Sequence, residues 1–381
     1  MRILYLCHDL DDAAIWRRVA MLQTGGAEVR AAGFRRGSGP LPGDAVVLGR
    51  TVDARMGQRA YSVLRALAGL RRSLGHEARP DAILARNLEM LVLARRTRRL
   101  WPGDPPGLIY EVLDIHRLMV GEGRRAQAMR AVERALLRGV GAVLTSSPAF
   151  ISNYFDRYRQ TQVPVHLVEN RYFEPRATAP NAVGPVRTPD EGTDRAVSIG
   201  WFGILRCRDS LACLDALTRA RPGRYVVEMR GKPALDVLPR FHEIVAANPD
   251  LRFHGPYRYP DDLPDMYTQV DLAWLLDGFD AGYNSAWLLP NRLYEGCRHG
   301  AVPIAQAGTQ TATFIQALGL GLVVSGPSAD ELDLALGQLT PGHLARLREL
   351  VHAVDPATWT ASDLDCRHLV SLVESPIRGL G

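Results

Sequence analysis

The stretch that decides the fold is Leu289-Pro290-Asn291-Arg292-Leu293-Tyr294-Glu295-Gly296-Cys297-Arg298-His299-Gly300-Ala301-Val302-Pro303-Ile304-Ala305. Proline suits the first turn of a helix, so we expect a helix to begin near Pro290. Gly300 is suited to end that helix, and the apolar run that follows is typical of a buried strand. Glu295 then lies about one turn inside the helix, where its carboxylate can accept hydrogen bonds from both hydroxyls of a ribose. The simpler alternative is that Glu295 only interacts with the helix dipole.

Short apolar runs alternate with helical periodicity on both sides of this stretch. Strand-like runs spaced by helices predict βαβ units and therefore parallel sheets. The alternation stops over 174–195, which holds four prolines and little apolar periodicity, and resumes after it. We therefore predict an α/β protein with a Rossmann-like domain over 1–173, a linker over 174–195, a second Rossmann-like domain over 196–355, and a C-terminal helix over 356–381 that packs back toward the first domain. The cleft between two such domains is the expected ligand site.

The composition indicates a soluble globular protein. Hydrophobic residues make up 46% and charged residues 23% of the 381 residues, which argues against disorder. No apolar run is long enough for a transmembrane helix, and the first one reaches His8 and Asp9 too early for a signal peptide. The five cysteines are scattered without a CxxC pair, so we expect neither disulfides nor a zinc site. These features predict a cytoplasmic protein.

The loop after the first predicted strand argues against two common nucleotide-binding classes. Arg2–Cys7 runs directly into His8-Asp9-Leu10-Asp11-Asp12, which contains no glycine. A dinucleotide-binding oxidoreductase needs a glycine-rich turn there, and acidic side chains repel a pyrophosphate. The chain also lacks the Walker A sequence of P-loop proteins. We therefore expect neither nicotinamide nor P-loop chemistry.

The segment 289–305 resembles the nucleotide-sugar signature E-x-x-A-x-G-x-P-V-I-A of GT-B glycosyltransferases. Other segments resemble further blocks of that family; they are Ile109–Asp114, Ala142–Ser147, Leu167–Asn170, Gly200–Arg208, Leu251–Asp271 and Ala307–Ile315. Within GT-B, Tyr110–Leu118 and the phrase PNRLYEG at 290–296 are similar to exopolysaccharide glucosyltransferases of the succinoglycan type. The resemblance covers nearly the whole chain and implies a GT-B fold, with two Rossmann-like domains facing a central cleft.

The resemblance implies a glycosyltransferase that moves a hexose, glucose from the nucleotide sugar UDP-glucose, to a polyprenyl-diphosphate-linked glycan in exopolysaccharide assembly. Retaining members of the family carry a glutamate eight residues before the signature glutamate, where this chain has Trp287. This departure favours an inverting transfer, in which one base activates the acceptor hydroxyl. Two alternatives stay open: a sugar-nucleotide epimerase of the same fold, and a non-catalytic subunit that binds a nucleotide sugar or a glycan.

An inverting transfer needs a base on the acceptor side, and Asp114 is the candidate. It follows the predicted strand Gly107–Val112 at the end that faces the cleft, with His116 close by as a second catalytic candidate. Glu111 and, in the loop after the first strand, Asp9 are candidate acceptor contacts. The alternatives are a turn cap for Asp114 and a supporting or surface role for His116.

Cations of the second domain are the candidates for binding the leaving diphosphate. Arg206 and Arg208 lie after a predicted strand, where the family places its diphosphate-binding cations, and a guanidinium binds phosphate oxygens bidentately. The other donor-binding candidates are the backbone of Gly203, Lys232, Asn291, Arg292 and, at the ribose, Glu295. The resemblance implies that arginines and helix ends replace a metal ion, so we expect no metal and no cofactor. The simpler alternative for both arginines is a solvated loop.

Charge is divided unevenly between the two predicted domains. Residues 1–173 hold 27 basic and 16 acidic residues, a net charge of +11, whereas residues 174–381 hold 19 and 25, a net charge of −6. In the predicted helix Ala54–Leu74, arginines alternate with leucines, a pattern that can bind an anionic membrane. We expect peripheral attachment to the inner face of the cell membrane, with an ordinary solvated helix face as the alternative. The first half shows no recognised nucleic-acid module, so we expect no nucleic-acid partner.

Overall fold

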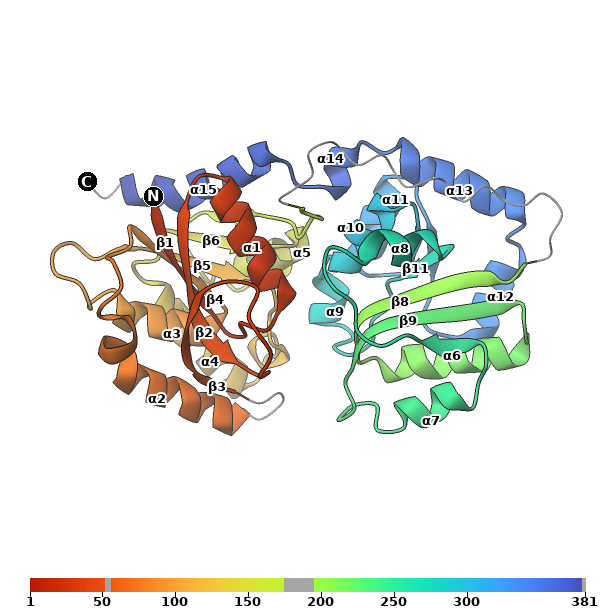
Figure 1. The fold of residues 1–381 in the computed structure, drawn as a ribbon, viewed down its shortest axis with the longest axis horizontal. Coiled ribbons are helices and arrows are strands. Elements are labelled where there is room, and N and C mark those ends of the chain that lie inside the picture. The colour runs from red at the N-terminus through yellow and green to blue at the C-terminus, as the bar shows by residue number, and fades with distance from the viewer. Residues whose placement is uncertain (52–55, 175–194, 379–381) are drawn as a thin grey trace. The chain divides into compact units, whose positions relative to one another are not determined.

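The described part of the chain forms two compact units. The computed structural model describes residues 1–51, 56–174 and 195–378 (Figure 1). Unit 1 consists of Met1–Glu169 with Ala361–Gly381, and unit 2 consists of Asn170–Thr360.

The boundary of unit 1 lies at 169, four residues before the position expected from the sequence. The reason is Tyr172, whose backbone N–H donates to the Trp359 carbonyl oxygen at 2.8 Å and whose side chain lies in a hydrophobic cluster of unit 2. Most of the expected linker, residues 175–194, lies outside the described residues.

Unit 1 is built on a parallel sheet with the strand order β3-β2-β1-β4-β5-β6-β7. The strands are β1 (Arg2–Cys7), β2 (Glu28–Arg35), β3 (Ala45–Arg50), β4 (Ala82–Arg86), β5 (Gly107–Val112), β6 (Ala142–Thr145) and β7 (Val165–Leu167). The central strands β4 and β5 are buried along their whole length, because helices cover both faces of the sheet. The strand order reverses between β1 and β4, since the chain builds first on one side of β1 and then on the other.

Helices lie on both faces of this sheet (Figure 1). On one face α1 and α15 contact each other, and α15 also contacts β4, β5 and β6. On the other face α3 lies between α2 and α4 and packs on β1, β4 and β5. The helices of unit 1 are α1 (Ala13–Thr24), α2 (Met56–Leu74), α3 (Leu88–Thr97), α4 (Arg124–Leu137), α15 (Asp363–Arg378) and the short η1 (Arg117–Met119), α5 (Pro148–Phe150) and η2 (Ile151–Asp156).

Two glycines let the end of α15 approach the sheet closely. A Cβ atom at Gly107 would lie 2.4 Å from Ile377, and one at Gly141 would lie 2.4 Å from Pro376. Such contacts are closer than packed carbon atoms allow, so these positions require glycine while α15 stays in place. The C-terminal helix therefore packs as an integral part of unit 1.

Unit 2 is built on a second parallel sheet with the strand order β10-β9-β8-β11-β12-β13, which reverses between β8 and β11. The strands are β8 (Val197–Leu205), β9 (Tyr225–Pro233), β10 (Leu251–Phe253), β11 (Leu272–Trp274), β12 (Val302–Gln306) and β13 (Leu322–Val324). The helices are α6 (Arg208–Ala220), α7 (Phe241–Ala246), α8 (Leu263–Thr268), α9 (Asn284–Trp287), α10 (Asn291–Arg298), α11 (Gln310–Ala317), α12 (Ala329–Gly337), α13 (Pro341–Ala353) and α14 (Pro356–Trp359). Among the helices that the structure describes in either unit, none combines the length and apolarity needed to cross a membrane.

Hydrophobic clusters cover both faces of the unit 2 sheet. Neighbouring residues of β8 point to opposite faces, so Trp201 belongs to one cluster and Phe202 to the other. At the amino end of β11, the buried Asp271 carboxylate binds Arg348 and Arg195, each at 2.6 Å. These ion pairs connect α13 and the segment before β8 to the start of β11.

The stretch 289–305 folds as its sequence predicts. α10 begins after Pro290 and ends at Arg298, and Gly300 follows with φ of +81° before β12 begins at Val302. A left-handed residue just past a helix end is a common C-terminal cap, which glycine adopts without steric cost. The expected helix stop at Gly300 is confirmed.

Candidate functional site

In open parallel sheets, ligands bind at the carboxyl ends of the strands where the strand order reverses. Each unit has one such position, between β8 and β11 in unit 2 and between β1 and β4 in unit 1. Some of the predicted site residues lie at one of these two positions, and others lie away from them or are buried.

In unit 2, Arg206 lies at the strand-order reversal. It follows β8, and its Nη2 lies 3.4 Å from Oδ2 of Asp277, which follows β11. Its guanidinium lies over the Phe279 ring, 4.6 Å from the ring centroid. The side chain keeps 31% of its surface exposed, so its remaining donors are accessible to a ligand.

A second guanidinium, that of Arg292, reaches the same sheet edge from the first turn of α10. Its Nη2 lies 3.5 Å from the carbonyl oxygens of Leu275 and Leu276, just past the end of β11. Its Nε is buried and has no hydrogen-bond partner among the described residues. Both guanidinium groups therefore reach the residues that follow β11, where Asp277 is the one carboxylate paired with Arg206. Two positive charges against one negative charge suit the binding of an anion such as a diphosphate.

Arg208 points elsewhere. It is exposed at the start of α6, and its Nε donates to the Val237 carbonyl oxygen at 2.7 Å in the segment after β9. In the sheet, β9 and β11 lie on opposite sides of β8. Of these two arginines, Arg206 contacts the residues after β11 and Arg208 contacts the segment after β9. Diphosphate binding by both together stays a prediction.

Gly203 and Gly231 form a close backbone contact at the carboxyl ends of β8 and β9. They are register partners with φ of +102° and +131°, and a Cβ atom at Gly231 would lie 1.9 Å from the Gly203 carbonyl oxygen. Next to them, Lys232 is exposed, and its side chain makes no hydrogen bond or ion pair with any residue that the structure describes. Its ammonium group is therefore available to a ligand at this edge.

Glu295 and Asn291 lie on α10. Glu295 is 4% exposed, and the Tyr267 hydroxyl donates to its Oε2 at 3.4 Å. Burial, followed by the nearby Glu295 carboxylate, raises the pKa of Tyr267 well above its ordinary value, so this phenol stays protonated as a donor. Asn291, the first residue of α10, is half-buried. Ribose binding by Glu295 stays a prediction.

In unit 1, Asp9 lies directly after β1, at the strand-order reversal. It is 8% exposed; its Oδ1 accepts from the Asp11 backbone N–H at 3.1 Å, and its Oδ2 lies 3.3 Å from Arg36 Nε. Burial raises the pKa of Asp9 although Arg36 opposes the shift.

Two neighbours of Asp9 were missed by sequence reasoning. His8 follows β1 and Asn87 follows β4, and Asn87 Nδ2 lies 3.3 Å from His8 Nδ1. Asn87 has φ of 73° and ψ of 165°, a region that glycine almost alone adopts, and its Oδ1 is buried with no hydrogen-bond partner in the described structure. Backbone strain and an unsatisfied amide oxygen are typical of binding and catalytic sites. The available signal was the position of each residue directly after an apolar strand.

The imidazole of His8 is held in its neutral form. Burial, with a further contribution from Arg86, lowers its pKa to about 4. At neutral pH the ring is therefore uncharged and can accept a proton or a hydrogen bond.

Glu111 does not contact the acceptor, and that prediction was wrong. The side chain is fully buried: its Oε1 lies 2.7 Å from Arg18 Nε, and the Tyr5 hydroxyl donates to its Oε2 at 2.5 Å. Arg86 Nε lies 4.0 Å from the same Oε2. Because β5 is covered on both faces, its side chains have no route to solvent. Glu111 instead supports the strands beneath the strand-order reversal.

Asp114 and His116 lie past the end of β5, one strand away from the reversal. Asp114 is exposed. His116 is also exposed, and its Nδ1 accepts from the Leu118 backbone N–H at 3.2 Å, which caps η1. The capping bond agrees with the supporting role considered for His116, and the catalytic roles of Asp114 and His116 stay predictions.

Comparison with known proteins identifies the family. The chain is 44% identical over 375 residues to the succinoglycan biosynthesis protein ExoL of Rhizobium meliloti (strain 1021), across 97% of this chain and 92% of that protein. The chain belongs to the ExoL family. This confirms the resemblance to exopolysaccharide proteins of the succinoglycan type. No protein-family model matches the chain.

Solved structures identify the fold. Sucrose-phosphate synthase from Thermosynechococcus elongatus superposes with a TM-score of 0.67 at 13% identity, over 100% of this chain and 97% of that chain. Anabaena HepE in complex with UDP and glucose gives 0.65 at 14% identity, over 98% and 99% of the two chains. WaaG, a glycosyltransferase involved in lipopolysaccharide biosynthesis, gives 0.54 at 13% identity, over 99% and 98%. These likenesses confirm the GT-B fold that the sequence predicted.

Proposed function

We propose that this member of the ExoL family is a glycosyltransferase of exopolysaccharide assembly that transfers glucose from UDP-glucose to a polyprenyl-diphosphate-linked glycan. The observation that carries the proposal is the meeting of Arg206 and Arg292 at the strand-order reversal of unit 2. A nucleoside diphosphate is the leaving group of such a transfer, and guanidinium groups stabilise its developing charge. The neighbour HepE was solved with UDP and glucose, which agrees with this donor class.

The proposed transfer assigns a task to each unit. The acceptor hydroxyl oxygen forms a bond to the anomeric carbon, the bond from that carbon to the diphosphate breaks, and UDP leaves with the bonding electrons. Trp287 in place of the first glutamate of the retaining pair favours an inverting transfer, and Asp114 is the base that takes the hydroxyl proton. Arg206 and Arg292 bind the diphosphate, Glu295 binds the ribose, and Lys232 is available to the phosphates or the sugar.

A donor panel tests the proposal directly. Thermal unfolding of the purified chain is measured with UDP-glucose, GDP-glucose and ADP-glucose, and we expect the UDP sugar to raise the midpoint most, since a ligand that binds only the folded state stabilises it. Transfer is then followed by release of UDP in the presence of a polyprenyl-diphosphate-linked acceptor. Absence of stabilisation by all three nucleotide sugars would refute the proposed donor site.

Trp287 also favours a second candidate, a non-catalytic subunit that binds the nucleotide sugar. Asp114→Asn separates the two, because the amide keeps the shape of the side chain and loses the base. For a transferase we expect at least about a hundredfold loss of turnover with unchanged donor binding. Donor binding by the wild-type chain without any transfer to the acceptor would favour the binding subunit.

We further propose that α2 attaches unit 1 to the anionic inner face of the cell membrane. On its outer face Tyr61 and Leu64 are 63% and 64% exposed, and Arg65, Arg71 and Arg72 are exposed around them. Apolar side chains flanked by arginines suit the interface of an anionic bilayer, where each cation contributes about 1 kcal/mol.

Vesicle co-sedimentation tests this attachment. Tyr61→Ser with Leu64→Ser is expected to reduce binding to phosphatidylglycerol vesicles severalfold, because apolar surface no longer enters the bilayer. The matched control is Leu334→Ser on α12 of unit 2, where the leucine is 68% exposed. Equal binding by both variants, or no binding by the wild type, would refute the proposal.

A further inference from the structure

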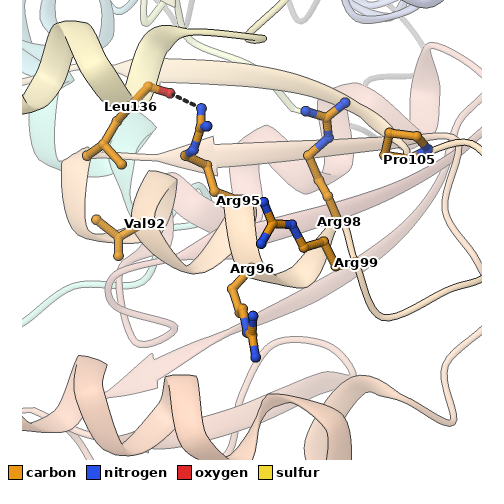
Figure 2. Close-up of a pocket in the computed structure, with 7 residues that line it drawn as sticks. All are labelled: Val92, Arg95, Arg96, Arg98, Arg99, Pro105 and Leu136. Atoms are coloured by element: carbon orange, nitrogen blue, oxygen red, sulfur yellow. Dashed lines mark hydrogen bonds between the residues drawn. The ribbon is translucent and has the colours of Figure 1, made fainter.

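A second cationic feature lies in unit 1, away from both strand-order reversals. A cavity of about 440 Å³ opens at the end of α3 and is lined by Val92, Arg95, Arg96, Arg98, Arg99, Pro105 and Leu136 (Figure 2). α3 runs from the carboxyl end of β4 to the amino end of β5, so its last turn lies at the opposite edge of the sheet from His8 and Asp9. The cavity therefore belongs to neither the donor nor the acceptor edge.

Two of the four arginines are anchored by backbone carbonyl groups. Arg95 Nη1 donates to the Leu136 carbonyl oxygen at 2.9 Å (Figure 2) and also to that of Arg138. Arg98 Nε donates to the Pro106 carbonyl oxygen at 2.7 Å. These bonds orient the two guanidinium groups at the cavity without neutralising their charge, because a carbonyl oxygen carries no net charge.

The other two arginines have no such anchor. Arg96 and Arg99 are exposed, and the side chain of neither makes a hydrogen bond or an ion pair with a residue in the described part of the chain. No carboxylate lines the cavity. Burial, with a contribution from Arg95, lowers the pKa of Arg98, which reflects the cost of holding like charges together.

Capping of helix ends explains only part of this cluster. Cations near a helix C-terminus interact favourably with the exposed carbonyl groups, which accounts for Arg95 and Arg98. It accounts neither for Arg96 and Arg99 nor for the cavity between them. A group of opposite charge is what this arrangement lacks.

We propose that this cavity is a binding site for a phosphate group carried by a small organic molecule. Guanidinium groups bind phosphate oxygens bidentately, and several of them around one cavity suit a dianion. The remaining walls, Val92, Pro105 and Leu136, are apolar and suit the organic part of the ligand. The volume lies within the usual range of small-molecule sites, about 300–1,000 Å³.

Two sources can supply this chemistry. One is a soluble phosphorylated compound, and the other is the headgroup of an anionic phospholipid, since α2 packs beside α3. In either case the ligand binds at the edge of the sheet opposite the transfer site. The site therefore serves regulation or anchoring of unit 1, and its existence is independent of the proposed transfer.

The proposal is tested by calorimetric titration of the full chain with pyrophosphate and with glycerol 3-phosphate. In a parallel experiment, the chain is titrated with phosphatidylcholine vesicles that either contain or lack phosphatidylglycerol. The test variant is Arg96→Gln with Arg99→Gln, which leaves the anchored arginines in place. The matched control is Arg346→Gln with Arg367→Gln, which removes the same charge from exposed positions on α13 and α15, outside α2 and α3. Arg206→Gln reports any phosphate binding at the donor edge.

We expect the test variant to bind at least about tenfold more weakly, because each charge-assisted hydrogen bond to phosphate is strong. The control and Arg206→Gln should bind as the wild type does at this site. Weakened binding of the soluble probes identifies a soluble ligand. Weakened binding of the phosphatidylglycerol vesicles alone, with the control unaffected, identifies a lipid headgroup. Equal binding by wild type and test variant in both arms, or no binding in either, overturns the proposal, provided that circular dichroism shows both variants folded.

Discussion

The two strand-order reversals occupy equivalent places in two similar sheets, yet their chemistry is opposite. In unit 2 the reversal carries the accessible cations Arg206 and Arg292. In unit 1, Arg18 and Arg86 are buried and paired with Glu111, and the partly exposed Arg36 is paired with Asp9. What unit 1 presents at its edge is a neutral imidazole, a strained amide and a carboxylate. One edge is therefore suited to a diphosphate, and the other to an uncharged hydroxyl group.

The largest expected effect comes from breaking the buried pair of unit 1. Glu111→Gln leaves Arg18 and Arg86 buried without their counter-charge, so we expect the free energy of unfolding to fall by about 3–5 kcal/mol. The matched control is Glu28→Gln, which breaks an exposed ion pair with Arg2 and should leave the free energy of unfolding nearly unchanged, because solvent screens the two charges. Scanning calorimetry measures both, and equal effects would show that the buried cluster does not support this edge.

The stability of the wild type and of Glu111→Gln should also depend differently on pH in the acid range. Burial raises the pKa of Glu111, but Arg18 and Arg86 outweigh burial and hold it below its ordinary value of 4.5. Above pH 4.5 the Glu111 carboxylate therefore contributes fully to the free energy of unfolding. This contribution is lost as the pH falls through the lower pKa of the folded state. Glu111→Gln should lack this acid-dependent loss.

Next in size is the loss of donor affinity at the unit 2 edge. Arg206→Gln removes a charge-assisted contact to the diphosphate, and we expect UDP-glucose to bind roughly ten- to a hundredfold more weakly. Arg208→Gln is the matched control, because Arg208 is held by Val237 on the other side of β8 and its loss should change affinity by no more than about threefold. Calorimetric titration measures the affinity of both variants for UDP-glucose. A larger loss of affinity for Arg208→Gln than for Arg206→Gln would indicate that the donor binds nearer to β9.

A smaller effect should follow from releasing the strain at Asn87. Glycine adopts its backbone conformation without cost, so Asn87→Gly is expected to raise the free energy of unfolding by about 1 kcal/mol. Asn87→Ala keeps the strain, loses the contact with His8, and should be less stable than the glycine variant. Thermal unfolding of the pair tests this. A glycine variant no more stable than the alanine variant would show that position 87 stores no strain.

The last effect, absent at pH 7, concerns His8. Its folded pKa of about 4 lies below the ordinary 6.5, so the unfolded chain takes up a proton first as the pH falls. Stability should therefore decrease between about pH 6.5 and pH 4, and His8→Gln should remove that part of the decrease. Proton NMR of the imidazole provides a direct check, and a His8 signal that titrates near pH 6.5 would show that the ring is not buried in solution.

Local patterns predicted most of the elements correctly. The apolar run Arg2–Cys7 is β1, and the strand expected over Gly107–Val112 is β5 with the same bounds. Periodicity does not reveal the role of Asp271, just before β11, whose carboxylate is the partner of two arginines from distant segments.

The sequence could place a candidate site residue in the fold where its position along the chain was sufficient, while the role of each residue stays a prediction. Arg206 and Arg292 follow or begin recognisable elements and do meet at one edge. Glu111 was misplaced because its exposure depends on the helices that cover β5, and these come from segments far away in the chain. The role of His8 was missed because its partner Asn87 is 79 residues away and becomes its neighbour only when β4 pairs with β1.

By itself, the sequence determined the alternation of strands and helices, the helix stop at Gly300 and the membership of a glycosyltransferase-like family, because each of these depends on residues close together in the chain. Only the tertiary structure decided which strands became neighbours, which arginines were neutralised and which stayed without a counter-charge. The reason is physical: burial and charge pairing are properties of the space around a side chain, and distant segments fill that space. The unpaired arginines at the end of α3 show this most clearly, since nothing in their local sequence distinguishes them from an ordinary basic helix end.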